Sequence, residues 1–287
     1  MDRLTDAAEI LERVRAERPL IHHITNFVTM NDVANATLAI GATPVMAHAV
    51  EEVSEVTASA RALALNLGTP SPARIEAMCA SGQTANQHHI PIVFDPVGVG
   101  ATQFRAESAR RLLDAARVQM IRGNASEVAA LVNSHITMRG VDANGAPRDV
   151  TASVQALAAL HHSVVAATGA RDFVSDGQRV IGIDNGHPWF ARITGAGCMA
   201  TAIVAAFAAV ETDRLRATVA ALTCYGIAGE IAAAHAAGIG SFKLRLMDAL
   251  FALTPEQIYS MAKIVVVDEA RKTNKTFSSF VTQKEDR

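Results

Sequence analysis

The stretch Ile90-Pro91-Ile92-Val93-Phe94-Asp95 is apolar over five positions and then ends in a carboxylate. Such an uninterrupted apolar run is typical of a strand at the centre of a parallel sheet, because helices cover both faces of that sheet. The run continues into Pro96-Val97-Gly98-Val99-Gly100-Ala101-Thr102, where two glycines allow a ligand to approach the backbone closely. The segment also fits a plain alternative, a Pro/Gly turn with an aspartate that caps the next helix.

Outside this stretch, short aliphatic or β-branched runs alternate with Ala- and Leu-rich segments. This alternation predicts an α/β fold, in which a mainly parallel sheet lies between two layers of helices in a three-layer α/β/α arrangement. We expect strands at residues 20–24, 62–66, 90–95, 118–121, 163–167 and 178–183. We expect helices between them at residues 29–39, 52–60, 73–87, 107–116, 125–132 and 150–160.

After Thr194 the pattern changes to helices alone. Two long Ala-rich helices are expected at residues 197–210 and 215–237, and a third near residues 254–266. No repeat or low-complexity linker divides the chain, so we expect one domain over residues 1–267. Residues 268–287 are then a polar C-terminal tail that we expect to be frayed.

The overall composition excludes some classes of protein. The net charge is −2, from 26 basic and 28 acidic residues without a basic cluster, so nucleic acid is not expected as a partner. The longest apolar run, residues 198–210, is shorter than the ~20 residues that a membrane-spanning helix needs. No secretory signal is expected, and three widely spaced cysteines suit a reducing compartment, so we expect a cytoplasmic protein without a membrane partner.

Functional side chains gather where predicted strands end, which is where α/β proteins bind their ligands. Asp95 ends one predicted strand, and the next one, residues 118–121, is followed by Arg122-Gly123-Asn124-Ala125-Ser126-Glu127. Arg122 is a permanent cation that can pair with phosphate. Asp95 and Glu127 could together hold Mg²⁺, which needs only one or two protein carboxylates. The alternative for the second segment is structural, with Asn124 and Glu127 capping the helix that follows.

The segment Ile193-Thr194-Gly195-Ala196-Gly197-Cys198-Met199-Ala200 is the strongest candidate for a phosphate site. Its glycines lead into a helix whose first N–H groups are free, which is a favourable place for an anion. Cys198 falls in the first helical turn, where the positive end of the helix favours its thiolate. The alternative is that Cys198 is a small buried core residue.

Two patterns that suggest other chemistry are rejected. Residues 195–200 fit G-x-G-x-x-G/A, but a dinucleotide-binding fold needs a second parallel strand and an acid about 20 residues further on. Here Glu211 and Asp213 lie between two predicted helices, and no Walker A sequence is present. Histidine pairs at 22–23, 88–89 and 161–162 are poor chelates, because neighbours in a strand face opposite sides. We expect these histidines at the surface or at loop ends.

Taken together, these segments resemble the hydroxyethylthiazole kinase family of the ribokinase-like superfamily, from about Pro19 to Leu253. Two departures are visible. Family members often have G-P-G-S-F where this chain has Gly238-Ile239-Gly240-Ser241-Phe242, and we expect this to change a turn that ends a helix. The second departure is a polar extension after Val267. The matching blocks are Ile21-His22-His23-Ile24-Thr25-Asn26, Gly41-Ala42-Thr43-Pro44-Val45-Met46-Ala47-His48, Leu65-Asn66-Leu67-Gly68-Thr69, the segments that begin at Asp95 and Arg122, Thr168-Gly169, Asp172, Asp176-Gly177, and Thr194 to Cys198.

The resemblance implies a ribokinase-like fold and a defined reaction. In that reaction the γ-phosphoryl group of ATP moves to the hydroxyl of 4-methyl-5-(2-hydroxyethyl)thiazole, in thiamine biosynthesis and salvage. The family also implies Mg²⁺ and a homotrimer with the thiazole pockets at its subunit interfaces. The composition, with half of the residues hydrophobic and 19% charged, suits such an assembly.

The resemblance also implies roles for single residues. Asn26, Met46 and Gly195 would bind the thiazole alcohol. Arg122, Thr168 and Gly197 would bind ATP, and Asp95 with Glu127 would serve the metal. Cys198 would be the catalytic residue, at a place where sugar kinases of the superfamily generally carry an aspartate that acts as base.

Two other functions stay open at this point. A related vitamin-alcohol kinase, acting on hydroxymethylpyrimidine or pyridoxal, shares the fold, although the blocks around Asn26 and Met46 favour the thiazole alcohol. A non-catalytic nucleotide-binding subunit could use the same scaffold. The presence of Asp95, Glu127 and Cys198 together argues for an enzyme, because a protein that only binds nucleotide does not need all three.

Overall fold

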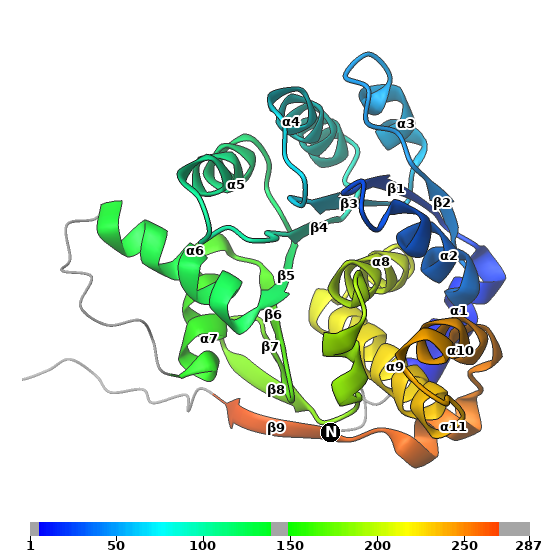
Figure 1. Cartoon of the computed structure of the whole chain (residues 1–287). Helices are drawn as coiled ribbons and strands as arrows, with labels where there is room; N and C mark the ends of the chain where they lie inside the picture. Colours follow the sequence, from blue (N-terminus) through cyan, green and yellow to red (C-terminus); the bar gives the residue numbers. More distant parts are fainter. Residues whose placement is uncertain (1–5, 139–148, 270–287) are drawn as a thin grey trace, which may run out of the picture.

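A computed structural model describes residues 6–138 and 149–269 of the chain. Within these residues the strands form a single nine-stranded sheet in the order β2-β1-β3-β4-β5-β6-β7-β8-β9 (Figure 1). The strands from β2 to β6 are parallel, and β7, β8 and β9 are antiparallel to their neighbours. The bounds are β1 Leu20–Ile24, β2 Thr43–Val45, β3 Ala62–Asn66, β4 Ile92–Asp95, β5 Met120–Asn124, β6 Val164–Thr168, β7 Asp172–Ser175, β8 Arg179–Ile183 and β9 Ile264–Glu269.

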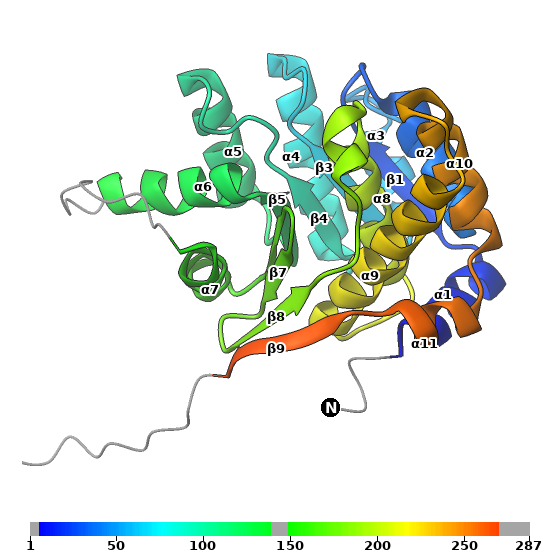
Figure 2. The same ribbon diagram turned by 60° about the horizontal axis from the view of Figure 1, so that its bottom comes forward.

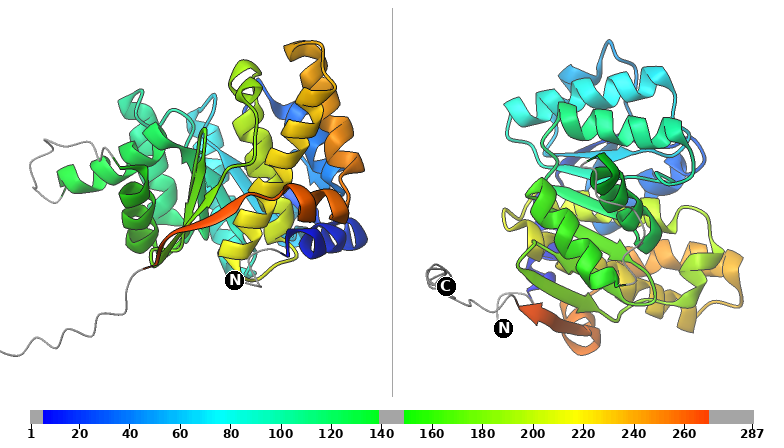
Figure 3. Two further views of the ribbon diagram at one scale, coloured as in Figure 1. Left: turned by 90° about the horizontal axis from the view of Figure 1, so that it is seen from below. Right: turned by 90° about the vertical axis from the view of Figure 1, so that its left-hand side faces the viewer.

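Helices cover both faces of this sheet (Figure 3, left). Helices α3 to α7 lie on one face, and α1, α2 and α8 to α11 lie on the other. The expected three-layer α/β/α arrangement is therefore confirmed. The bounds are α1 Ala7–Glu17, α2 Met30–Ile40, α3 Val53–Ser59, α4 Pro72–Gln87, α5 Gln103–Ala115, α6 Ala125–Met138, α7 Val150–His161, η1 (a 3₁₀ helix) Pro188–Arg192, α8 Ala196–Ala208, α9 Arg214–Ala234, α10 Ile239–Ala252 and α11 Pro255–Met261.

The strand β4 shows why its sequence is apolar at successive positions. Val93 packs into the core on the side of α8 and α9, whereas Ile92 and Phe94 pack into the core on the side of α4 and α5. All three side chains are fully buried. Each contributes about 1.5–3 kcal/mol by burial, so only an apolar residue suits either face of the strand.

The C-terminal part of the fold differs from the prediction. The helix expected near residues 254–266 ends at Met261, and Ile264–Glu269 forms the edge strand β9 beside β8 (Figure 2). β9 passes the expected domain end at Val267 by two residues, and residues 270–287 of the predicted tail lie outside the described residues. The segment at Gly238 begins helix α10 instead of changing a helix end, with Phe242 N–H bonded to Gly238 O at 2.8 Å.

The pair His22 and His23 is buried, contrary to the expected surface position. His22 Nδ1 lies 2.8 Å from Thr57 Oγ1, and its Nε2 lies 2.8 Å from Ala47 O. His23 Nε2 lies 3.2 Å from Thr37 Oγ1. The reason is that β1 is covered on both faces, so both side chains of the pair point into packed layers and find polar partners there.

Helix α9 is a core element. Within the described residues it alone has the length and apolar composition that could cross a membrane, and 78% of its apolar window is buried inside the fold. That degree of burial is typical of the central helix of a globular domain.

Candidate active site

Four polar residues end neighbouring strands at one edge of the sheet. In the strand registers Asn66 of β3 pairs with Asp95 of β4, and Asn124 of β5 pairs with Thr168 of β6. Parallel strands place their carboxyl ends together, and helix α8 packs over β3 and β4. The beginning of α8 and the strand ends therefore form one site.

Cys198 lies at the centre of this site, in the first turn of α8. Its Sγ accepts hydrogen bonds from Asn26 Nδ2 at 3.3 Å and from Asn66 Nδ2 at 3.4 Å. Asn26 Nδ2 also donates to Asn66 Oδ1 at 3.1 Å. The helix starts at Gly195, whose φ of 91° is in the left-handed region that favours glycine.

The loops that carry the two asparagines are joined by Arg74, a buried cation in the first turn of α4. Arg74 Nη2 donates to Thr25 O at 2.5 Å, directly before Asn26. Arg74 Nη1 donates to Gly68 O at 2.8 Å, two residues after Asn66. Arg74 thus holds the ends of β1 and β3 in the relation that brings both amides to the thiol.

Asp95 is buried beside the thiol. Its Oδ2 accepts from Asn66 Nδ2 at 2.8 Å and from Thr201 Oγ1 at 2.9 Å, while its Oδ1 is buried without a partner among the described residues. Burial raises the pKa of Asp95 to about 6, and the nearby Arg122 opposes that shift. Asn66 therefore connects the carboxylate and the sulfur through a single amide group.

Arg122 connects Asp95 to the start of α8. Its Nη1 lies 3.7 Å from Asp95 Oδ2, and its Nη2 donates to Thr168 Oγ1. Gly197 lies against the same guanidinium, since a Cβ added there would be 2.5 Å from Arg122 Nη1. The structure thus brings together Arg122, Thr168 and Gly197, the three residues predicted to bind ATP.

These three residues line a cavity of about 520 Å³. Its wall continues over Asp172, Asn185 and Tyr225. Burial raises the pKa of Asp172 to about 6. Tyr225 donates its hydroxyl to Ala196 O at 2.9 Å, which fixes the first turn of α8 beside the cavity. A cavity of this size suits a nucleotide-sized ligand.

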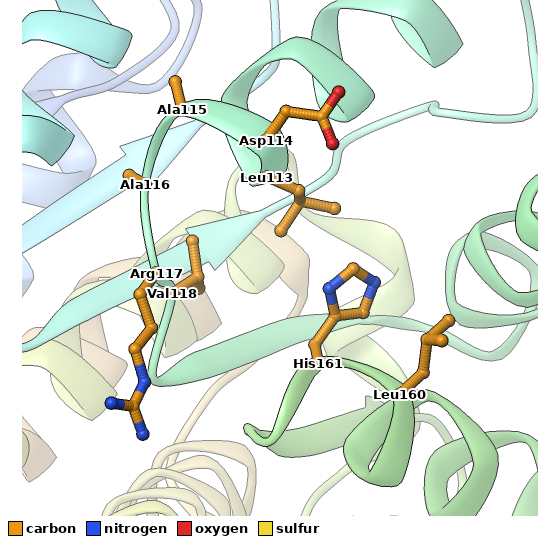
Figure 4. Close-up of a pocket in the computed structure, with 8 residues that line it drawn as sticks. All are labelled: Leu113, Asp114, Ala115, Ala116, Arg117, Val118, Leu160 and His161. Atoms are coloured by element: carbon orange, nitrogen blue, oxygen red, sulfur yellow. The ribbon is translucent and has the colours of Figure 1, made fainter.

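A second cavity, of about 370 Å³, lies elsewhere in the molecule. Figure 4 shows its lining, which includes Asp114, Arg117 and His161. Val118 and His161 precede β5 and β6 in the chain, so this cavity lies at the amino ends of the strands. The length of the strands therefore separates this cavity from the candidate active site.

Glu127 is held beside the loop that follows β4. Its Oε1 accepts from Gly98 N–H at 2.9 Å, and its Oε2 accepts from Asn124 N–H at 2.8 Å. Asn124 Oδ1 accepts from Glu127 N–H at 2.9 Å, which completes a reciprocal helix cap. The capping interpretation of this segment is confirmed. Among the described residues there is no cluster of three His, Cys, Asp or Glu side chains that could hold a metal ion alone.

The thiolate that the helix start predicts for Cys198 is not favoured in the free protein. Burial and then the negative charge of Asp95 raise the pKa of the thiol. Hydrogen bonds from Thr29, Asn26 and Asn66 act in the opposite direction and are weaker. That expectation was wrong because burial of the sulfur, and then the carboxylate of Asp95 from another strand, outweigh the positive helix end.

The predicted alcohol-binding residues are placed at the same edge of the sheet. Asn26 bonds to Cys198, and Gly195 packs against Thr29, with 3.0 Å between an added Cβ and Thr29 Cγ2. Met46 is half-buried directly after β2, the strand beside β1. It lies at the same edge but outside the hydrogen-bonded cluster.

Two residues of the cluster were not among the predicted site residues. Asn66 ends a predicted strand, so the rule that selected Asp95 could have selected it. Thr201 lies three residues after Cys198, which places both on one face of α8. The spacing was visible in the sequence, but its meaning depends on Asp95, which comes from a distant segment.

A family model, a related sequence and a solved structure all match this chain to the same family. The model of the hydroxyethylthiazole kinase family matches residues 11–256. Hydroxyethylthiazole kinase of Chloroflexus aggregans is 53% identical over 258 residues, covering 90% of this chain and 93% of the relative. The structure of a hydroxyethylthiazole kinase protein from Pyrococcus horikoshii is 40% identical, with a TM-score of 0.85, and covers 92% of this chain and 99% of that one.

A more distant structure supports the fold alone. A ribokinase-like superfamily protein from Enterococcus faecalis is 12% identical, with a TM-score of 0.59 over 85% of this chain and 93% of that one. The expected ribokinase-like fold is therefore confirmed. With the family model covering most of the chain and a relative at 53% identity, the chain belongs to the hydroxyethylthiazole kinase family.

Proposed function

We propose that this enzyme transfers the γ-phosphoryl group of ATP to the primary hydroxyl of 4-methyl-5-(2-hydroxyethyl)thiazole. The observation that carries the proposal is the position of the first turn of α8 between two groups of side chains. Arg122 and Thr168 line the cavity of about 520 Å³ on one side of this turn. Asn26 lies on the other side of the turn, where it bonds to Cys198. The nucleotide occupies the cavity, and the alcohol lies near Asn26, Gly195 and Met46.

The start of α8 binds the transferred phosphoryl group. The first helical bond runs from Met199 N–H to Gly195 O, so the N–H groups of residues 196–198 have no acceptor within the helix. Free N–H groups at a helix start attract anions. Arg122 adds a permanent positive charge beside them. In phosphoryl transfer most of the catalytic effect comes from such positioning and charge neutralisation.

Cys198 is the catalytic residue that faces the hydroxyl of the alcohol. Because its pKa is raised, the thiol is protonated in the free enzyme and is a poor proton acceptor. In a loose transition state the hydroxyl loses its proton late, so base catalysis contributes little. Cys198 therefore acts mainly by shaping the place where the hydroxyl meets the phosphoryl group.

A magnesium ion fits the carboxylate side of the site. Asp95 Oδ1 is buried and has no hydrogen-bond partner in the part of the chain that the structure describes, and Glu127 is fixed nearby by two backbone N–H groups. Magnesium in kinases takes most of its ligands from phosphate and water and needs only one or two carboxylates. Asp95 and Glu127 would hold the ion on the protein side, and its charge would offset that of the phosphates.

We expect a homotrimer with sites at its interfaces. The side chains that support this proposal follow β1 and lie on α2. Phe27 is 58% exposed, Val28 is 68% exposed and Leu38 is 52% exposed. Apolar side chains this exposed near one site are typical of a surface that another subunit covers.

The three cysteines are free thiols, which supports a cytoplasmic location.

A coupled ADP-release assay tests the proposed function. The enzyme is given ATP and Mg²⁺ with the thiazole alcohol, hydroxymethylpyrimidine or pyridoxal, and each reaction is repeated with EDTA. We expect ADP release with the thiazole alcohol that stops on chelation. Faster turnover of either other alcohol would identify a related vitamin kinase. ATP binding without ADP release for any alcohol would identify a nucleotide-binding subunit.

A further inference from the structure

An ion pair joins the helices α2 and α10 next to the candidate active site. Lys243 Nζ of α10 lies 2.7 Å from Asp32 Oδ2 of α2. The side chain of Lys243 is 36% exposed, and that of Asp32 is 21% exposed. The pair is therefore partly shielded from water, and its charges act over a longer range than those of a fully exposed pair.

Asp32 lies where two helix beginnings meet. It is the third residue of α2, which Thr29 caps. Its carboxylate also lies close to Gly195, the cap of α8, because a Cβ built at Gly195 would be 3.5 Å from Asp32 Oδ2. The same Cβ would be 3.0 Å from Thr29 Cγ2, so Thr29 also lies beside this glycine. The positive ends of both helices thus adjoin one carboxylate.

An unpaired charge on Asp32 would oppose the function of the α8 start. A carboxylate within one helical turn repels a phosphate at the free N–H groups, and it offsets the positive potential that attracts the phosphate. Lys243 places a positive charge directly on that carboxylate. The pair as a whole is neutral, so the N–H groups and Arg122 keep their attraction for an anion.

We propose that Lys243 is a positioning residue for the phosphates of ATP, which acts by neutralising Asp32 beside the amino end of α8. The inference rests on the proposed function, because it needs the phosphates at this helix. It differs from an ordinary stabilising ion pair in one respect. Removal of Lys243 and removal of Asp32 change phosphate affinity in opposite directions.

The test is a double-mutant cycle on the kinetics of the full-length enzyme. For Lys243→Gln we expect the KM for ATP to rise about five- to tenfold, more strongly at low salt. For Asp32→Asn we expect the KM to fall about two- to fivefold, since Lys243 is then an unpaired cation near the phosphates. The double variant should return close to the wild-type KM, because both charges are absent.

A matched control is available on the same helix. Arg245 Nη1 lies 3.7 Å from Asp248 Oδ2 at the exposed surface of α10, and Arg245→Gln should leave the KM for ATP unchanged. The melting temperature of each variant is measured in parallel. If both single variants lower the melting temperature while the KM stays constant, or if both shift the KM in the same direction, the pair is merely structural and the inference is wrong.

The inference and the proposed function fail differently. If the wild-type enzyme releases no ADP with any alcohol, the proposed function fails. Calorimetric titration of ATP into the same four proteins then tests the inference, with the same expected order of affinities. If the wild-type protein does not bind ATP at all, both are wrong.

Discussion

Gly197 lies directly against the guanidinium of Arg122, and a Cβ carbon at position 197 would sit 2.5 Å from Arg122 Nη1. The glycine is needed here for this close approach, since position 197 lies in the regular helix α8. The contact connects the residue that carries the positive charge to the N–H groups at the helix start. It makes the first turn of α8 and Arg122 one binding unit.

Substitution of this glycine should weaken ATP binding without unfolding the protein. In Gly197→Ala the new methyl group displaces the guanidinium from its position beside Asp95 and Thr168. We expect the KM for ATP to rise about tenfold or more, which corresponds to about 1.4 kcal/mol. Arg122→Ala should raise the same KM further. Steady-state kinetics with varied ATP measure both effects.

A glycine in open space provides the comparison. A Cβ added at Gly240, in the first turn of α10, meets nothing within 4 Å. Gly240→Ala should therefore leave the KM for ATP unchanged. An unchanged KM in Gly197→Ala or Arg122→Ala would contradict the assignment of Arg122 to ATP.

Loss of the thiol should reduce turnover only in part. For Cys198→Ala we expect kcat to fall about tenfold. This loss is smaller than the roughly 10²–10⁴-fold that a general base contributes, because the thiol is protonated in the free enzyme. The KM for ATP should change little, since Cys198 faces the two asparagines. Cys79→Ala, in a buried thiol on α4, is the control. Full wild-type turnover in Cys198→Ala would remove Cys198 from the mechanism.

The amide of Asn66 should matter for both stability and turnover. In Asn66→Ala the buried carboxylate of Asp95 keeps Thr201 as donor but loses the amide. A lost hydrogen bond to a buried charge costs about 1–3 kcal/mol, which urea unfolding can measure. The kcat should fall as well, because Cys198 also loses a donor. Asn35→Ala, at an exposed amide of α2 that bonds to Asn31, should change neither quantity.

The buried His23 should make the fold sensitive to acid. Burial and the neighbouring His22 lower the pKa of His23 from 6.5 to about 3. In the unfolded chain His23 therefore binds a proton near pH 6.5, whereas in the folded protein it binds one only near pH 3. Stability is thus fully present above pH 6.5 and falls as the pH decreases through this window. The slope is at most about 1.4 kcal/mol per pH unit.

Chemical denaturation between pH 5 and pH 7 measures this slope. His23→Gln, which can still bond to Thr37, should have a flatter dependence than the wild-type protein. His235→Gln, at an exposed position after α9, should keep the wild-type dependence. An equal slope in all three proteins would show that His23 does not control the acid sensitivity.

Much of the layered fold could be read from local patterns. The strands β1 and β3 have the expected bounds, Leu20–Ile24 and Ala62–Asn66. These elements follow from burial on both faces, which favours apolar side chains at most positions of the two strands; His22, His23 and Asn66 are the polar exceptions. The same holds for Asp95, Arg122, Gly197 and Cys198, because strand ends and glycine-helix junctions are recognisable from neighbours in the chain.

The elements that the prediction missed depend on a partner. β2 Thr43–Val45 has three residues, one of them proline, and exists because it pairs with the edge of β1. The run Ile264–Val267 suits a helix or a strand, and β8 makes it a strand. Such short apolar runs are ambiguous until the partner that receives their hydrogen bonds is known.

The chemistry of the site depends in the same way on segments far apart in the chain. Position in the first turn of α8 favours a thiolate, yet burial and the charge of Asp95 raise the pKa of Cys198. Arg74 aligns the loops that bring Asn26 and Asn66 to the sulfur. Residue types and their order along the chain define which groups can react. Their burial, charge and mutual distance arise from packing between distant segments, because electrostatic energies depend on separation in space rather than in sequence.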